Sequence, residues 1–396
     1  MATKAYKKGG GSCMMRAAKL CLLFLLPLWI TTGCWNHMEP DQLSFVTGNG
    51  IDLTEDGKLE ASTLVVVPTG VAGGGQISGG EKKESFHVIS ATGINVTEAI
   101  VNIQAKLSRV VFQGHREIVL VGQRLAEQGI GETIDPFLRN GQSHMQSLIF
   151  VVKSGNPKDV FSNEPKFEPY ISTALQDEQT ALGFKPYLSR EFIADVVSDG
   201  TQPLLPVVSL NSTKNFSYSG SAILNKDDGV KLVGFLNRKE SYYVSWMTDR
   251  LTSLTLTSFV PKGNGNVSVR LEKLGRRIRV KKVDERIQFD VHLIGVGTIL
   301  ENNTNLDPSR RKDLLLIQDE LSHKTQKYIQ LLVKKVQKKY KMDIFGFGES
   351  VHQQYPQKWK TLKKNWPKTF PTVDVSVKLD LQINDPGLTN SSLNKP

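Results

Sequence analysis

Seven histidines and three cysteines are the side chains of this 396-residue chain with the widest catalytic and metal-binding chemistry. No histidine has a second ligand at helical spacing, and the chain contains neither His-Glu-x-x-His nor Gly-x-Ser-x-Gly. The carboxylates are scattered and form no evident pairs. The sequence therefore predicts no catalytic residue, no metal site and no cofactor, and it favours a binding or scaffolding protein over an enzyme.

The cysteines suggest a different chemistry, because all three lie near the N-terminus. Residues 20–30 are apolar except for Pro27, and five lysines and arginines without an acidic residue precede them. A membrane-spanning helix needs about 20 apolar residues, so this run of 11 fits the core of a secretory signal instead. We expect residues 1–33 to be a signal peptide, for which a start at Met14 would be more ordinary than Met1.

The short stretch before Cys34 resembles the lipobox of bacterial lipoproteins. Thr32 and Gly33 supply the small residues of that motif, whereas Thr31 stands where leucine is usual. In such proteins the cysteine thiol is diacylated and the cysteine becomes the first residue of the mature chain. The resemblance predicts lipidation of Cys34, and the alternative is a buried N-terminal helix with an incidental cysteine.

Removal of the signal would change the composition of the chain. Cys34 would be the only cysteine left, so the mature chain could form no internal disulfide. The formal net charge would fall from +11 to +6, because the signal holds five basic residues and no acidic one. Such an excess favours an anionic membrane surface. Nucleic acid is not expected, because no aromatic residue interleaves with the basic run at 275–282.

The N-terminal half alternates short apolar strands with helices. Strands are predicted at 58–68, 116–122 and 146–155. A helix is predicted from Asn95, which can cap it together with Glu98 three residues later. Strands that alternate with helices predict a sheet covered by helices on at least one face.

The C-terminal half predicts a different sheet. A hairpin is expected over 217–237, and strands over 254–300 should be antiparallel because their connections are short. Asp307 should cap a long amphipathic helix that follows it. Residues 373–383 alternate apolar and polar at every position, as in a strand with one buried face.

These elements predict an α+β protein with two or three mixed domains, the C-terminal one a largely antiparallel sheet covered by a long helix. Pro203 and Pro206 place the expected boundary. The expected divisions are a signal peptide at 1–33, an N-terminal α+β domain with one or two subdomains at 34–205, a C-terminal α+β domain at 206–387 with its long helix at about 308–341, and a tail at 388–396.

Trp359 and Trp366 form a candidate contact with a partner protein. They are seven residues apart and share a helical face with Leu362. The alternative, which the sequence favours, is that both pack in the core under the sheet.

Five strings, in order along the chain, carry a resemblance to a known family. They are CWNHMEPDQL (34–43), SRVVFQGHREIVLVGQRLAEQGI (108–130), IDPFLRN (134–140), GSAILNKDDGVKLVGFLNRKES (220–241) and DIFGFGESVHQQYPQKWKTLKKNW (343–366). The chain resembles the Ger(x)C family of spore-germination lipoproteins, the C subunits of nutrient germinant receptors. Asn36 departs from the family pattern, in which an acidic residue commonly follows Cys-Trp.

The resemblance implies a non-enzymatic protein that is lipid-anchored on the outer face of the spore inner membrane. It implies integral-membrane A and B subunits as partners, with a small nutrient as a candidate ligand. The alternative from another class is a substrate-binding lipoprotein of a transporter, which would need a ligand cleft between its domains.

Overall fold

The structure is a computed structural model, and it describes residues 39–66, 86–139, 145–163, 165, 167–168, 170–211, 215–282 and 286–385. The chain divides into two compact units, Met1–Leu43 and Ser44–Pro396. Within the first unit, the described part holds one 3-10 turn, η1 (Pro40–Gln42).

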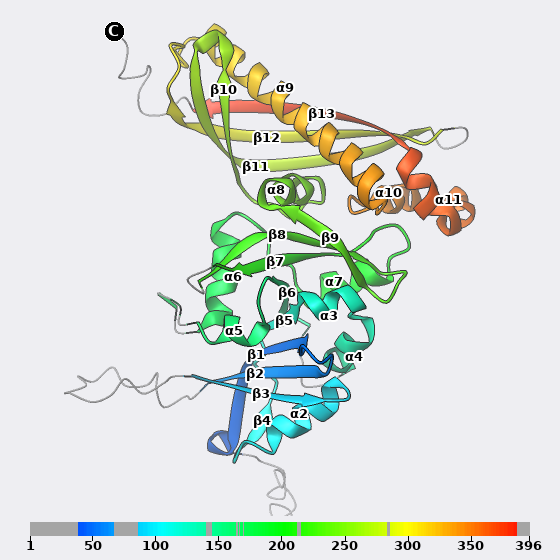
Figure 1. The fold of residues 1–396 in the computed structure, drawn as a ribbon. Helices are drawn as coiled ribbons and strands as arrows, with labels where there is room; N and C mark the ends of the chain where they lie inside the picture. The colour runs from blue at the N-terminus through cyan, green and yellow to red at the C-terminus, as the bar shows by residue number, and fades with distance from the viewer. Residues whose placement is uncertain are drawn as a thin grey trace, which may run out of the picture. The chain divides into compact units, whose positions relative to one another are not determined.

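The N-terminal half of the second unit is built on one mixed sheet of nine strands among the described residues, in the order β3-β2-β1-β5-β6-β7-β8-β9, with β4 also paired to β1 (Figure 1). Strands β1, β5, β6 and β7 pair in parallel, and antiparallel strands flank them on both sides. The bounds are β1 (Leu43–Leu53), β2 (Leu59–Val66), β3 (Phe86–Gly93), β4 (Val110–Phe112), β5 (Ile118–Gly122), β6 (Leu148–Lys153), β7 (Leu204–Leu210), β8 (Phe216–Asn225) and β9 (Lys231–Asn237).

Helices cover both faces of this sheet, which confirms the predicted layering. One face buries apolar residues of α2 (Val96–Gln104), α3 (Gln123–Gln128), α4 (Gly131–Arg139) and α7 (Ser189–Val197). The other face buries residues of α5 (Pro157–Phe161) and α6 (Ile171–Ala181). The parallel strands β5 and β6 are buried along nearly their whole length, as expected of strands with helices on both sides.

The predicted cap of α2 is present. The Asn95 side chain accepts a hydrogen bond from the backbone N–H of Glu98 at 2.9 Å. The Glu98 carboxylate reaches back to the N–H of Ile94 at 2.5 Å, one residue before the position that a capping box would use.

Asn95→Ala should therefore lower the free energy of unfolding by about 1 kcal/mol, whereas Asn384→Ala on the exposed face of the last strand should change it by less than about 0.5 kcal/mol. Urea unfolding of the two variants measures the difference.

The C-terminal sheet has the order β10-β11-β12-β13. Its strands are β10 (Leu254–Val260), β11 (Gly265–Lys282), β12 (Gln288–Asn302) and β13 (Asp374–Asp385). The first three pair antiparallel, as predicted, whereas β13 pairs in parallel with β12. Val377, Leu379 and Leu381 of β13 are buried and the residues between them are not, which confirms the alternating pattern.

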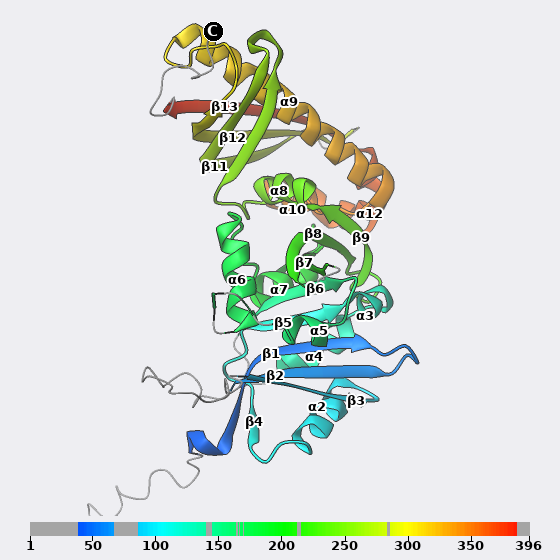
Figure 2. The same cartoon turned by 60° about the vertical axis from the view of Figure 1, so that its left-hand side comes forward.

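The long helix α9 (Arg311–Lys335) runs along this sheet and continues into one π-helical segment, η4 (Val336–Tyr340) (Figure 1; Figure 2). It buries Ile317, Leu321 and Leu332 of the predicted apolar stripe. Asp307 does not cap it, and that prediction is wrong. Its carboxylate instead accepts hydrogen bonds from the N–H and hydroxyl of Ser309, forming a separate turn before the helix.

The predicted boundary between 205 and 206 does not separate the two sheets. It falls inside β7, whose two neighbours are both strands of the large sheet. The large sheet continues through β9 to Asn237, and α8 (Arg238–Met247) then leads to β10. Both prolines are compatible with this strand: Pro206 lies within β7, and Pro203 directly precedes it.

The remaining helices follow α9 and precede β13. They are α10 (Phe347–Gln354), α11 (Pro356–Leu362), η5 (Lys363–Asn365), α12 (Trp366–Thr369) and η6 (Phe370–Thr372), and η3 (Pro261–Gly263) joins β10 to β11.

Candidate functional site

The lipidation site predicted at Cys34 lies outside the described residues, as do the signal peptide and the predicted tail. Within the described part of the chain, no helix combines the length and apolar character needed to cross a bilayer. Nor do the described residues bring three histidine, cysteine or acidic side chains together in a way that could bind a metal ion.

Trp359 and Trp366 are core residues. Their side chains are 2% and 4% exposed, and their rings meet edge-to-face at 5.4 Å between centroids. Trp366 also packs against Phe289 and Phe370. The prediction that they contact a partner is therefore wrong, because neither indole is available at the surface.

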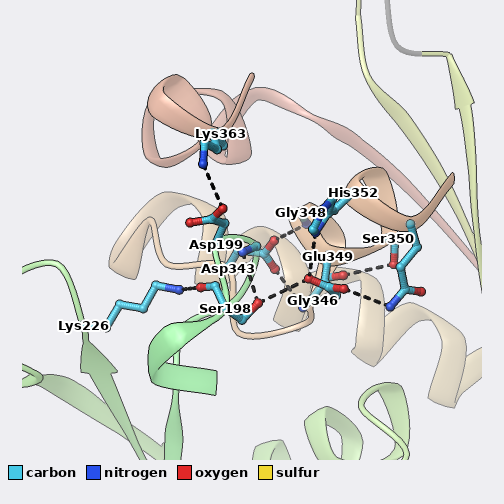
Figure 3. A network of polar contacts seen from close by, with 12 residues as sticks. Ser198, Asp199, Lys226, Asp343, Gly346, Gly348, Glu349, Ser350, His352 and Lys363 are labelled. Carbon is cyan, nitrogen blue, oxygen red and sulfur yellow. Dashed lines mark hydrogen bonds and ion pairs between the residues drawn. The ribbon is translucent and has the colours of Figure 1, made fainter. Parts of the chain in front are cut away.

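Trp366 instead helps to enclose a buried carboxylate, that of Asp343. Figure 3 shows Asp343 beside Gly346 and Gly348. Five N–H groups donate to its two oxygens at 2.7–3.2 Å. The donors are the backbone amides of Phe345, Gly346, Phe347 and Gly348 and the indole of Trp366. We call this arrangement the Asp343 cage.

The Asp343 cage fastens the segment after α9 to the segment before β7. The backbone N–H of Gln202 donates to the Asp343 carbonyl at 2.8 Å, and that of Glu349 donates to Gly200 at 3.1 Å. A Cβ on Gly200 would lie 2.2 Å from the Glu349 nitrogen, so only glycine permits this approach. The two sheets are therefore joined here by main-chain contacts that a side chain would block.

Charged side chains surround this junction (Figure 3). Lys363 pairs with Asp199 at 3.1 Å, and the Ser198 hydroxyl donates to Glu349 at 3.3 Å. Lys226, from the turn between β8 and β9, donates to the Ser198 carbonyl. These contacts link Ser198, Asp199 and the turn at Lys226 to the helices that follow α9.

Burial raises the pKa of Asp343 to about 6, and the hydrogen bonds from Gly348, Phe347, Trp366 and Phe345 oppose this shift without cancelling it. The folded pKa then exceeds the unfolded value of 3.8, so the folded state holds the proton more tightly between them. The free energy of unfolding should therefore fall as pH rises from about 4 to 6, by up to about 3 kcal/mol from this group. Urea unfolding across that range, with Asp343→Asn as the variant without the titrating group, measures the contribution. An unchanged pH profile in the variant would contradict it.

A groove of about 550 Å³ is the second notable feature. It is lined by residues 254–258 of β10, by the first part of α8 and by the middle of α9. We call it the β10 groove. Its volume lies within the range of about 300–1,000 Å³ that is usual for ligand sites.

The β10 groove is basic and aromatic. Arg238, Lys239 and Lys324 are among its lining residues, and no acidic residue is. The rings of Tyr243 and Tyr328 lie 5.1 Å apart, and the ammonium of Lys239 lies 4.5 Å from the centre of the Tyr328 ring. Burial raises the pKa of Tyr243 to about 12, so this phenol stays neutral and leaves the positive charge of the groove in place.

Sequence analysis identified neither the Asp343 cage nor the β10 groove. The sequence does contain a local indication of the cage. An aspartate that lies two to five residues before glycines can accept hydrogen bonds from several of the backbone N–H groups that follow it. The groove has none, since its lining comes from three elements spread over residues 238–328.

Comparisons with known proteins cover nearly the whole chain. The family described as "Spore germination protein N-terminal domain" matches residues 36–210, and the family described as "Spore germination B3/ GerAC like, C-terminal" matches residues 219–387. Two relatives from Bacillus subtilis (strain 168) are spore germination protein KC and spore germination protein B3. Each is 24% identical, over 96% and 93% of this chain and 98% of its own length. The chain belongs to the GerC-type family of spore germination proteins.

A solved structure has the fold of this family member. The crystal structure of the GerBC protein matches 88% of the chain and all of its own length, with a TM-score of 0.55 and 20% identity. The likeness confirms the mixed α+β fold. The first family match ends at residue 210, at the end of β7, and the second begins at residue 219. Both positions lie within the large sheet of this GerC-type protein.

Proposed function

We propose that this GerC-type chain is the C subunit of a nutrient germinant receptor, bound to the outer face of the spore inner membrane through diacylated Cys34. In that position it would contact integral-membrane A and B subunits and take part in germination signalling. The observation that carries the proposal is the match of both germination-protein families, at 36–210 and 219–387, downstream of a lipobox-like cysteine.

A lipid anchor gives this role a physical basis. Each acyl CH₂ buried in the bilayer contributes about 0.8 kcal/mol, and two chains suffice for stable attachment where one does not. Attachment confines the folded domains to a thin layer beside the embedded subunits, where their effective concentration can reach about the millimolar range. A modest interface would then be occupied nearly all the time.

The role we propose is non-catalytic. Two aspartates that the sequence could have offered as catalytic groups have structural partners: Asp343 accepts five N–H groups, and Asp195 bonds Tyr187 and Arg250. A transporter lipoprotein would be expected to hold its ligand between two domains. The lining of the β10 groove comes entirely from residues after Asn237, which gives that alternative no support.

Crosslinking in intact spore membranes tests the proposal. We expect A and B receptor subunits to be the main proteins attached to this chain, because the anchor keeps all three in one layer. Recovery of the chain crosslinked to a transporter permease instead, or to neither receptor subunit, would contradict the proposed role.

A further inference from the structure

The β10 groove follows the free edge of a sheet. β10 is the terminal strand in the order β10-β11-β12-β13, so one of its two edges has no strand partner. Five consecutive residues of β10, 254–258, line the groove, although successive side chains of a strand point to opposite faces. No residue of β11 lines it. A groove over one face of the sheet would be lined by alternate residues of β10 and by residues of β11. This groove therefore runs along the edge.

The edge presents unpaired backbone groups. In an antiparallel pair, alternate residues direct both their N–H and C=O towards the partner strand or away from it. Lys324 of α9 donates to the carbonyl of Phe259 at 2.5 Å, which places that carbonyl on the side of the helix. By alternation, the N–H and C=O of Thr255 and Thr257 face the same side. An exposed edge of this kind is a template for another strand.

The charge of the groove selects what can lie there. Of its three cations, Lys324 pairs with Glu320 at 3.0 Å, Arg238 donates to the carbonyl of Tyr218, and Lys239 lies over the Tyr328 ring. Arg238 and Lys239, two of the three cations of the described lining, thus have no carboxylate among these contacts. Their positive charge is complementary to acidic side chains.

We propose that the β10 groove binds an extended acidic segment of a partner protein, which adds to β10 as a further strand. Backbone hydrogen bonds to Thr255 and Thr257 would supply affinity, and Arg238 and Lys239 would select glutamate or aspartate side chains. Tyr242 and Tyr328, which are partly exposed, offer apolar contacts to residues between the acidic ones. The five lining residues of β10 correspond to about 17 Å of extended chain. This inference goes beyond the proposed receptor role and does not depend on the anchor.

Fluorescence anisotropy with the purified full chain in detergent tests this. The probe is a labelled peptide of four Glu-Val repeats, blocked at both ends. We expect saturable binding that Lys239→Glu weakens about tenfold or more, because the substitution reverses a charge in the groove. Lys312→Glu, the same change at an exposed position of α9 outside the groove, should alter the dissociation constant by less than about twofold.

Two further probes decide the mode of binding. The same peptide with N-methylated backbone amides keeps its charges but cannot pair with a strand edge, so it should bind at least about tenfold more weakly. Equal binding of the methylated peptide would overturn strand addition. Displacement by free glutamate at the same concentration as by the peptide would show a site for small anions and overturn the proposal. Absence of saturable binding up to about 1 mM, or equal effects of the two charge reversals, would also overturn it.

Discussion

Asp343→Asn is expected to lower the free energy of unfolding by about 1–3 kcal/mol at pH 7, because the cost of two unmatched buried donors exceeds the gain from removing a buried negative charge. An asparagine oxygen can accept the three N–H groups that now reach Oδ1, but its NH₂ group would face the two donors that reach Oδ2. Those donors are the Gly348 amide and the Trp366 indole, and both are buried. Each buried donor left without an acceptor costs about 1–3 kcal/mol.

Asp374→Asn is the matched control for this prediction. Asp374 is a partly exposed carboxylate that pairs with Arg286 at 3.0 Å, and exposed pairs of this kind contribute about 0–1 kcal/mol. Urea unfolding of both variants provides the comparison. Similar losses in the two would show that the Asp343 cage does not hold the junction between α10 and the strand segment at Gly200.

Cys34→Ala is expected to release the protein from the spore inner membrane and to slow nutrient-triggered germination by about tenfold or more. Without the thiol there is no site for the diacylglyceryl group, and the 11-residue apolar run of the signal is too short to span the bilayer. Loss of the anchor would dilute the folded domains away from their membrane partners and remove the gain in effective concentration.

Cys21→Ala serves as the control, because Cys21 lies in the segment that we expect to be removed from the mature chain. It should leave both membrane attachment and germination unchanged. Fractionation of broken spores followed by immunodetection measures attachment, and loss of optical density after addition of nutrient measures germination. A Cys34→Ala protein that remains membrane-bound in spores that germinate normally would contradict the proposed anchor.

The predictions that rested on local sequence patterns were the ones confirmed. The 217–237 hairpin, the alternation of β13 and the apolar stripe of α9 are each set by residues close together in the chain, and the structure contains all three. Asp307 shows where local reasoning fails. An aspartate before a helix can cap it or form its own turn with Ser309, and the sequence contains no feature that decides between them.

The surface groove and the arrangement of the strands could not be predicted, because they depend on contacts between residues far apart in the chain. The β10 groove needs α8, β10 and α9 to meet, and its basic character comes from Lys324 lying beside Arg238 and Lys239. The extent of the large sheet could not be deduced either, because Pro206 is tolerated within β7 as readily as at a domain boundary. The direction of β13 was also open, since its alternating pattern fits parallel or antiparallel pairing.

Mass spectrometry of the N-terminal peptide, taken from the chain as it occurs in spore inner membranes, is the decisive test of the proposed anchor. We expect a peptide that begins at residue 34 and carries a thioether-linked diacylglyceryl group on sulfur. A peptide that extends upstream of residue 34, or one whose cysteine has a free thiol, would contradict it.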